Sequence, residues 1–398
     1  MAAGSATMPA PKVRERPAWM QDVGPKILAL LLAFAIALAL GGAIIALYGE
    51  NPIDVYRVIL EGSFSDATDF GRVLAIATPL IFSALAVAVC FKAGMFNIGV
   101  EGQFLVSMVT AAVAALYLDF LPAPLHVAAV LLFAMAGGVI WASIPAVLKV
   151  KTGAHEVVTT IMLNGIAISL VAWAINGPLH FTETGEFNVD LRTDHFPDSA
   201  LIPDMGHLFG IGPSANVSWL LPLAIVAAVL VWFLIKRTRL GYEARAVGSS
   251  TGSARAGGIS VGAVQIKLFM ISGALAGLVG MQQILADKGY LPQNYEAQLG
   301  FTGIAVAFLG QNNPIGIVFA AIVWGVLSRG ESSLQLETEV PREFMIILQG
   351  ILIMSVVITY QLASRRIARR QLRAAGEVER LDDAEAPADV EAIATEDR

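Results

Sequence analysis

The sequence has 398 residues, of which 56% are hydrophobic and only 15% are charged, with a net charge of −6. Soluble domains are about one quarter charged, so this composition excludes a chain built from water-soluble domains. The single cysteine, Cys90, excludes a disulfide framework, and the five histidines show no metal-ligand spacing. No nucleotide-binding P-loop, zinc-protease or serine-hydrolase motif occurs in the sequence. These properties predict a polytopic membrane protein that is not itself an enzyme.

Taken in chain order, the apolar segments predict about ten membrane spans. A helix needs about 20 predominantly apolar residues to cross the hydrocarbon core of a bilayer. Segments of this kind occupy residues 27–48, 71–90, 95–118, 125–148, 156–177, 217–235, 263–286 and 343–362. Between residues 300 and 330, Gln311 to Pro314 interrupt the apolar sequence, because two asparagines and a proline are costly against lipid. This interruption predicts two short spans, 299–311 and 315–329, joined by a tight turn.

The placement of basic residues supports ten spans and orients them. With ten crossings, most of the 26 Lys and Arg residues fall on one side of the membrane, as the positive-inside rule requires. Both termini are then cytoplasmic, in a multi-pass protein of the cell membrane. If residues 300–330 crossed only once, the basic C-terminal segment would lie outside.

The terminal segments and the loops complete the predicted organisation. We expect two disordered cytoplasmic segments, residues 1–26 and 363–398, to flank a transmembrane domain at 27–362. The second segment, 363–398, is first basic and then acidic. An acidic loop at 49–70 is predicted to follow the first span. The longest external loop, 178–216, is also acidic and suits either a docking or gating surface or a simple connector.

Two similar motifs indicate an internal repeat. Asn97-Ile98-Gly99 precedes one span, and Asn313-Pro314-Ile315-Gly316 precedes another near the C-terminus. Each is followed by apolar sequence rich in Gly, Ala and Ser, which allows helices to approach closely. Ten spans divide into two halves of five, and the second half starts from the opposite side. The sequence therefore predicts two halves with inverted topology.

Polar residues beside the spans are the candidates for a pathway or its gate. No Asp, Glu, Lys or Arg lies at the centre of a span, which disfavours an ion-coupled carrier. Asn97 and Glu101 share a helix face because they are four residues apart. In the functional interpretation, these two residues and Gln103 contact a solute or form part of a gate. In the structural interpretation, Asn97 caps the helix, and Glu101 complements the helix dipole and pairs with Lys92. Asn164 faces either a neighbouring helix or the pathway.

The cytoplasmic loop 236–262 contains a short segment bounded by glycines. Gly241 to Gly248 carry closely spaced alanines, and small residues continue to Ile259. A short helix of this composition fits a groove of another protein. The alternative is that its basic residues only fix the topology.

Several sequence blocks resemble the permease subunits of nucleoside-type ABC importers, in a wider family that includes simple-sugar and branched-chain amino acid permeases. The resemblance covers about residues 25–365. Its most specific block is Phe91–Gln103, which reads FKAGMFNIGVEGQ. The further matching blocks are Glu156–Asn164 (EVVTTIMLN), Gly241–Gly248 (GYEARAVG), Gly300–Ala307 (GFTGIAVA) and Asn312–Gly316 (NNPIG).

The resemblance implies a membrane-spanning subunit that forms the translocation pathway for nucleosides and binds no cofactor, since ATP is bound by a separate cytoplasmic ATPase. It also implies an extracytoplasmic binding protein and a second homologous permease, as a heterodimer rather than a homodimer. Nucleic acid is not among the implied partners. The coupling helix that would contact the ATPase includes Gly241, Glu243, Arg245, Ala246, Gly248, Ala254, Gly258 and Ile259. Ser249-Ser250-Thr251 departs from the usual family pattern.

Three alternative functions differ from this expectation. The substrate could be ribose, another simple sugar or a branched-chain amino acid, within the same family. An ion-coupled secondary transporter is disfavoured by the uncharged span centres. An intramembrane enzyme is disfavoured because the sequence offers no paired carboxylates, histidine cluster or nucleophile with a base.

Overall fold

The computed structural model describes residues 18–180, 191–337, 341, 343–362 and 365. Over these ranges the chain is helical, and the only extended pairings are two isolated backbone bridges. The chain divides into two compact units, one of residues 1–43 and 350–398 and one of residues 44–349. The predictions of disorder for residues 1–17 and 366–398 fall outside the described residues.

The first unit contains most of helix α1 (Ala18–Tyr48) and of the C-terminal helix (Glu343–Leu362). Both helices are long and apolar enough to cross a membrane. Helix α1 begins at Ala18, before the predicted start at residue 27, so the prediction of disorder is wrong for residues 18–26. Leu31 and Leu32 remain exposed, as expected for side chains that face lipid rather than protein.

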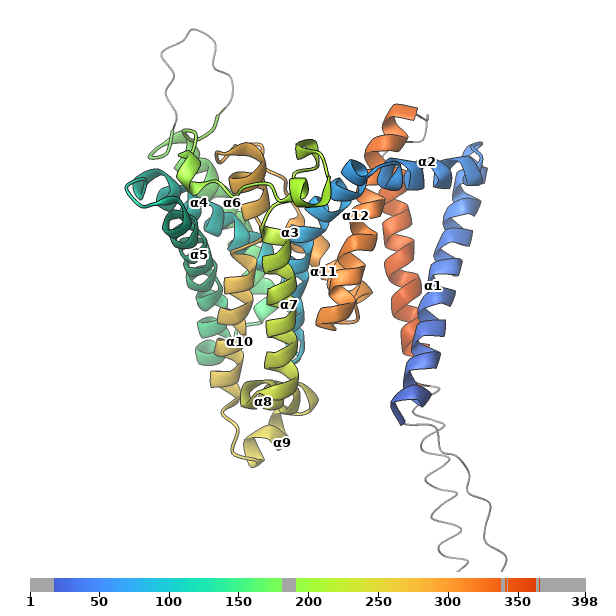
Figure 1. Cartoon of the computed structure of the whole chain (residues 1–398). Helices are drawn as coiled ribbons and strands as arrows, with labels where there is room; N and C mark the ends of the chain where they lie inside the picture. Colours follow the sequence, from blue (N-terminus) through green and yellow to red (C-terminus); the bar gives the residue numbers. More distant parts are fainter. Residues whose placement is uncertain (1–17, 181–190, 338–340, 342, 363–364, 366–398) are drawn as a thin grey trace, which may run out of the picture. The chain divides into compact units, whose positions relative to one another are not determined.

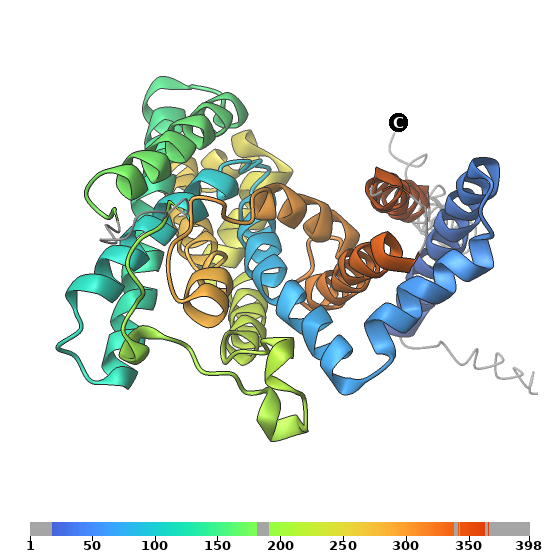
Figure 2. The same ribbon diagram turned by 90° about the horizontal axis from the view of Figure 1, so that it is seen from above.

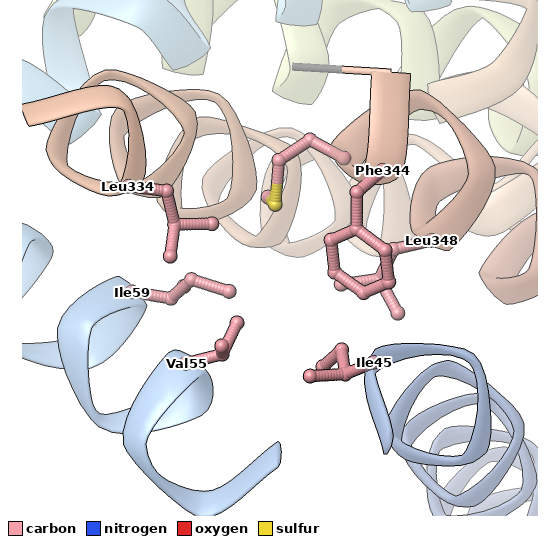
Figure 3. Packing of buried hydrophobic residues seen from close by; sticks show 7 residues of the cluster. Ile45, Val55, Ile59, Leu334, Phe344 and Leu348 are labelled. Atoms are coloured by element: carbon pink, nitrogen blue, oxygen red, sulfur yellow. The ribbon is translucent and has the colours of Figure 1, made fainter. Parts of the chain in front are cut away.

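The second unit begins with a helix that the sequence analysis did not predict. Residues 52–64, expected to be part of an acidic loop, form α2 (Pro52–Phe64). Asn51 caps this helix by accepting a hydrogen bond from the Ile53 backbone N–H at 3.1 Å. One face of α2 packs into a cluster of buried apolar side chains, which Figure 3 shows. The cluster comprises Ile45, Val55, Ile59, Leu334, Phe344, Met345 and Leu348.

The ten predicted spans are present as helices. In the second unit, six helices are long enough to cross a membrane, and α10 and α11 are shorter apolar helices. The long ones are α3 (Ala67–Phe91), α4 (Val100–Tyr117), α5 (Ala123–Thr152), α6 (Glu156–Asn176), α7 (Leu220–Arg237) and α12 (Pro314–Glu337). Helix α3 is largely buried and contacts α7, α10, α11 and α12, so it is central in this unit (Figure 2). The inverted relation of the two halves stays a prediction.

Helices α5 and α10 (Val261–Ala276) touch through their backbones. A Cβ atom added at Gly138 would overlap the carbonyl oxygen of Gly273, and one added at Gly277 would overlap the carbonyl of Ala134. Small residues therefore set this interhelical distance, as is common in membrane proteins. The predicted span 263–286 is wrong in one respect, because it is not a single continuous helix. Helix α10 ends at Ala276, a turn follows, and Gln282–Lys288 forms a π-helix.

The tight turn predicted between two short spans is confirmed. Helix α11 (Leu299–Leu309) ends just before Gln311 and Asn312, whose φ angles are 57° and 51°. Asn313 then accepts a hydrogen bond from the Ile315 backbone N–H at 3.2 Å and caps α12. Helix α12 continues to Glu337, beyond the predicted end at residue 329. Arg329 therefore lies inside a helix rather than in a loop.

The two ends of the second unit differ. Helices α8 (Arg239–Ser249) and α9 (Thr251–Ala256) lie at one end, and the loop of residues 191–219 lies at the other (Figure 1). This loop forms three short 3-10 helices, Asp198–Ala200, Gly206–Phe209 and Pro213–Ala215. Backbone hydrogen bonds attach it to the segment after the π-helix: the Phe196 N–H donates to the Gly289 carbonyl at 2.7 Å. Residues 181–190 lie outside the described residues.

Candidate functional site

Asn97 lies at the centre of a buried hydrogen-bond cluster. Its side chain is fully buried, and its amide nitrogen donates to the Ser272 hydroxyl at 2.8 Å and to Gln103 Oε1 at 3.1 Å. Its amide oxygen accepts from the Gly99 backbone N–H at 3.0 Å and from Gln103 Nε2 at 3.2 Å. These bonds connect the α3–α4 loop, α4 and α10. Gly99, rather than Asn97, occupies the N-cap position of α4.

Glu101 connects α4 to the start of α11. The carboxylate is only 4% exposed and accepts hydrogen bonds from the backbone N–H groups of Gln298 and Gly300, both at 2.8 Å. A carboxylate at a helix N-terminus interacts favourably with the helix dipole and with the unpaired N–H groups there. Glu101 therefore complements the dipole of α11, instead of pairing with Lys92 as the structural alternative expected.

Asn164 joins α6 to the same cluster. Its Oδ1 accepts from the Gly102 backbone N–H at 2.9 Å, and its Nδ2 donates to the Ile98 carbonyl at 3.1 Å. These contacts are with the α3–α4 loop and the first turn of α4. The structure thus brings together all four predicted pathway residues, Asn97, Glu101, Gln103 and Asn164, as one buried cluster. Their role in a pathway or gate stays a prediction.

A cavity of about 320 Å³ lies elsewhere in the second unit, nearer the end that carries the loop 191–219. None of the four predicted pathway residues lines it. The cavity is bounded by α3, α12, the π-helix and the segments before α7 and α11. Its lining residues are Arg72, Ala75, Ile76, Pro79, Ser214, Ala215, Asn216, Val279, Gln282, Gln283, Asp287, Glu296, Leu299, Arg329 and Ser332.

Three polar side chains of the cavity wall are held by contacts within the chain. Gln282 is buried, accepts from the Ser218 hydroxyl at 2.6 Å and donates to the Asn216 carbonyl at 2.8 Å. Asn216 Nδ2 in turn donates to Asp287 Oδ1 at 2.6 Å. These bonds fix the π-helix against the segment before α7. Gln282 and Asn216 therefore position Asp287.

The two arginines of the cavity share one carboxylate. Arg72 and Arg329 lie 3.3 Å and 3.0 Å from Asp69 Oδ1. On the other wall, partial loss of hydration and, less strongly, the charge of Asp287 raise the pKa of Glu296, although this residue keeps an exposed surface. Two buried polar atoms of the lining, Gln283 Oε1 and Arg329 Nε, have no hydrogen-bond partner among the described residues. Such groups are rare in folded proteins and call for an explanation.

Sequence reasoning missed this cavity. Gln283 stands out only as one of several polar residues beside spans, and Arg72 and Arg329 occur near predicted span ends. One signal was available in the sequence, the arginine at residue 329, at the end of an apolar segment. An arginine in a membrane helix is costly unless it has a partner, so this position indicated a buried ion pair. That partner, Asp69, is 260 residues from Arg329 in the sequence, so the pairing could not be predicted.

The predicted coupling segment forms two helices separated by a capping residue. Thr238 caps α8, with its hydroxyl accepting from the Gly241 N–H at 3.2 Å. Ser250 caps α9 by accepting from the Ser253 N–H at 3.2 Å. The departure from the family pattern at Ser249-Ser250-Thr251 therefore supplies a helix N-cap. Ala254 is the buried residue of α9. The Ile259 N–H donates to the Ala254 carbonyl at 3.0 Å in the turn that includes Gly258.

Several residues of α8 pack inward against their own chain. A Cβ atom added at Gly241 would overlap the carbonyls of Leu234 and Ile235, and one added at Gly248 would overlap the Lys92 carbonyl. Arg245 donates to the Ile235 carbonyl. Burial, together with the charges of Lys236 and Arg245, lowers the pKa of Lys92. The small residues of α8 therefore permit close contact with α7 and with the α3–α4 loop.

The outward face of α8 and α9 is exposed. Tyr242 is 63% exposed, and most of α9 faces solvent. Glu243 is paired with Arg239 at 2.7 Å, and Ala246 is half-buried. This exposed face is available to another protein.

Comparison with known proteins identifies the family. The model of the family described as "Branched-chain amino acid transport system / permease component" matches residues 70–357. This range includes both the buried cluster around Asn97 and the cavity.

Several relatives match over most of the chain. The guanosine ABC transporter permease protein NupP of Bacillus subtilis is 35% identical over 340 residues, which cover 84% of this chain and 94% of NupP. The glucose ABC transporter permease protein TsgB13 of Haloferax volcanii is 33% identical over 348 residues, covering 86% and 89%. A second guanosine permease protein of Bacillus subtilis, NupQ, is 28% identical over 285 residues, covering 70% and 87%.

Proposed function

The chain belongs to the family of branched-chain amino acid transport system permease components, and from this premise we propose that it is the transmembrane subunit of an ABC importer for nucleosides. The observation that carries the proposal is the 35% identity to a guanosine permease along 94% of that relative's length. The polar but charge-balanced cavity agrees with an uncharged, hydrogen-bonding substrate.

The exposed face of α8 and α9 is the proposed docking site for the ATPase, which binds and hydrolyses the ATP. A displacement of α8 would reach the α3–α4 loop directly, because Gly248 touches the backbone at Lys92. The same loop carries Asn97, and Glu101 just beyond it is bonded to the start of α11. Leu299 at the start of α11 lines the cavity. In this proposal, these contacts would connect the ATPase docking face to the cavity.

The remaining partners follow from family membership. We propose a second, different permease as the pairing subunit, supported by the match of two distinct guanosine permeases of Bacillus subtilis. The loop 191–219 would lie outside and contact the extracytoplasmic binding protein, with α8, α9 and both termini on the cytoplasmic side. A reporter fused after Arg366 should then be cytoplasmic, and one within residues 185–205 external. An external reporter after Arg366 would contradict this topology.

Uptake measurements test the substrate. Cells with the complete importer should accumulate labelled guanosine against a gradient, and deletion of this chain should abolish the accumulation. The process should stop when the partner ATPase is inactivated. Concentrative uptake driven only by an ion gradient would refute the ABC mechanism.

The second candidate substrate is a simple sugar, because a glucose permease is 33% identical to this chain. Labelled glucose and ribose should therefore be measured in the same strains, with leucine as the amino acid alternative. Sugar uptake that depends on this chain, without guanosine uptake, would replace nucleosides as the proposed substrate.

A further inference from the structure

We propose that the cavity lined by Arg72, Gln283, Asp287 and Glu296 is a substrate site within the permease itself, which binds the vicinal diol of a ribose ring through the carboxylates of Asp287 and Glu296. This inference deepens the proposed function and rests on it. It assigns recognition to the permease in addition to any recognition by a binding protein. The cavity volume of about 320 Å³ falls at the lower end of the range for small-molecule sites.

The charges of the cavity favour a neutral ligand. Arg72 and Arg329 are both directed to Asp69, so their charge is partly neutralised before any ligand enters. Asp287 and Glu296 supply negative charge on the opposite wall. Lys288, whose ammonium lies 3.8 Å from Asp287, offsets part of this negative charge. The three acidic residues, Asp69, Asp287 and Glu296, are then balanced by the three basic residues, Arg72, Lys288 and Arg329, so a polar, uncharged molecule is favoured over an anion or a cation.

The hydrogen-bonding groups left over for a ligand are chiefly acceptors. The Asp287 carboxylate accepts one hydrogen bond, from Asn216 to Oδ1, and its Oδ2 lies 3.8 Å from the Lys288 ammonium. Because a carboxylate has about four acceptor sites, it keeps further acceptor capacity. The Glu296 side chain lines the same cavity. Gln283 contributes a buried oxygen that has no partner among the described residues. Two carboxylates on the wall of one cavity can accept hydrogen bonds from the two hydroxyl groups of a vicinal diol.

The local backbone also indicates a binding site. Gln282, Gln283 and Asp287 all belong to the π-helix Gln282–Lys288. π-Helical segments are rare and are frequently found at functional sites. Here the segment places two residues, Gln283 and Asp287, on the same cavity, while Gln282 anchors the segment to Ser218 and Asn216.

Protection of an engineered cysteine tests the site. Ser332 lines the cavity and is exposed, so Ser332→Cys should react with a maleimide, whereas the only native cysteine, Cys90, is buried. In membranes from cells that produce the complete importer, guanosine should slow the labelling of Ser332→Cys. Asn294→Cys, in the exposed segment before α11, serves as the control that guanosine should leave unchanged.

Analogues identify the group that is recognised. 2′,3′-Dideoxyguanosine, which lacks the diol, should protect poorly, and Asp287→Asn should raise the guanosine concentration needed for protection about tenfold, the effect of one lost hydrogen bond to a charged group. Asp119→Asn, on an exposed turn, is the matched control. Glu296→Gln provides a second test if Asp287→Asn is absent from the membrane.

The outcomes separate the site from the proposed function. Equal protection by guanosine and its dideoxy analogue would refute recognition of the diol. Guanosine uptake without any protection would refute the site while leaving the proposed function intact. Protection by ribose or glucose, without protection or uptake of guanosine, would support a diol site and refute the nucleoside substrate.

Discussion

The cluster around Asn97 and the cavity near Asp287 both place polar side chains inside a membrane protein, but they differ in how those side chains are bonded. In the cluster, the amides of Asn97 and Asn164 each use both their oxygen and their nitrogen within the chain. In the cavity, Gln283 Oε1 has no partner among the described residues. The cluster satisfies its amide groups within the chain, and the cavity wall leaves an acceptor without a hydrogen bond from the described residues.

This difference separates two reasons for which a membrane helix keeps a polar residue. A self-satisfied cluster joins helices, because breaking it leaves buried polar groups without partners. A partly unsatisfied wall reduces stability and is retained where a ligand supplies the missing bonds. Variants in the cluster should therefore affect stability first, and variants in the cavity should affect selectivity first.

The largest expected effect is at Glu101. Glu101→Ala would leave the N–H groups of Gln298 and Gly300 without their carboxylate partner, and should cost about 3 kcal/mol, since bonds to charged groups contribute about 1.5–3 kcal/mol each. Thermal denaturation of the purified chain, followed by size-exclusion chromatography, should show a clearly lower midpoint. Glu101→Gln, which can still accept, should lose less. An unchanged midpoint for Glu101→Ala would contradict a structural role.

A smaller loss is expected at Asn164. Asn164→Leu removes two hydrogen bonds and should destabilise the chain by about 1–2 kcal/mol, since each such bond between membrane helices contributes about 0.6 kcal/mol on average and up to about 1.7 kcal/mol. Asn176→Leu, on the same helix, is the matched control, because Asn176 is exposed and, among the described residues, its side chain bonds to the Ala172 carbonyl of α6 itself. If both variants melted alike, the bonds of Asn164 to the α3–α4 region would contribute nothing measurable.

At Gln283 the expected stability change has the opposite sign. Gln283→Leu keeps a similar volume and removes a buried oxygen without a partner, so it should leave the chain equally stable or more stable by about 1 kcal/mol. The same variant should transport guanosine more slowly, measured as initial uptake at equal membrane levels. A variant that loses stability, or that transports normally, would remove the contrast between the two regions.

The smallest effect concerns the titration of Glu296. Partial loss of hydration and, less strongly, the negative charge of Asp287 raise the pKa of Glu296, so Asp287→Asn should move that pKa part of the way down towards its ordinary value. Carbodiimides react with the protonated carboxyl group, and the midpoint of Glu296 modification against pH should therefore shift to lower pH. Mass spectrometry of the modified peptide measures this shift. No shift would mean that the two carboxylates do not interact.

The membrane-spanning plan could be predicted because it depends on local properties. Apolar length set most spans, and the asparagines and proline at 311–314 marked the turn between α11 and α12. Helix α2 was missed since it is too short to span and its buried face depends on Leu334 and Phe344, far away in the sequence. The end of α10 at Ala276 was missed because Gly277 serves a contact with α5 that only the fold brings about.

The candidate site was less accessible to sequence reasoning. Polarity singled out Asn97, Glu101 and Asn164, and the structure gathers them, but polarity alone does not distinguish a satisfied bond from an available one. That distinction depends on partners such as Gly300 and Gly102, which contribute only backbone atoms. Since every residue has a backbone N–H, no sequence pattern marks these partners.

The contact between Gly138 and Gly273 has a consequence for how this protein can evolve. A side chain fits at neither position, because a Cβ atom added at Gly138 would overlap the Gly273 carbonyl, and one added at Gly273 would overlap the Gly138 carbonyl. A larger residue at one position cannot be compensated by a smaller residue at the other, because no amino acid is smaller than glycine. Divergence therefore has no neutral first step at this pair, and lineages that change the substrate should still inherit both glycines.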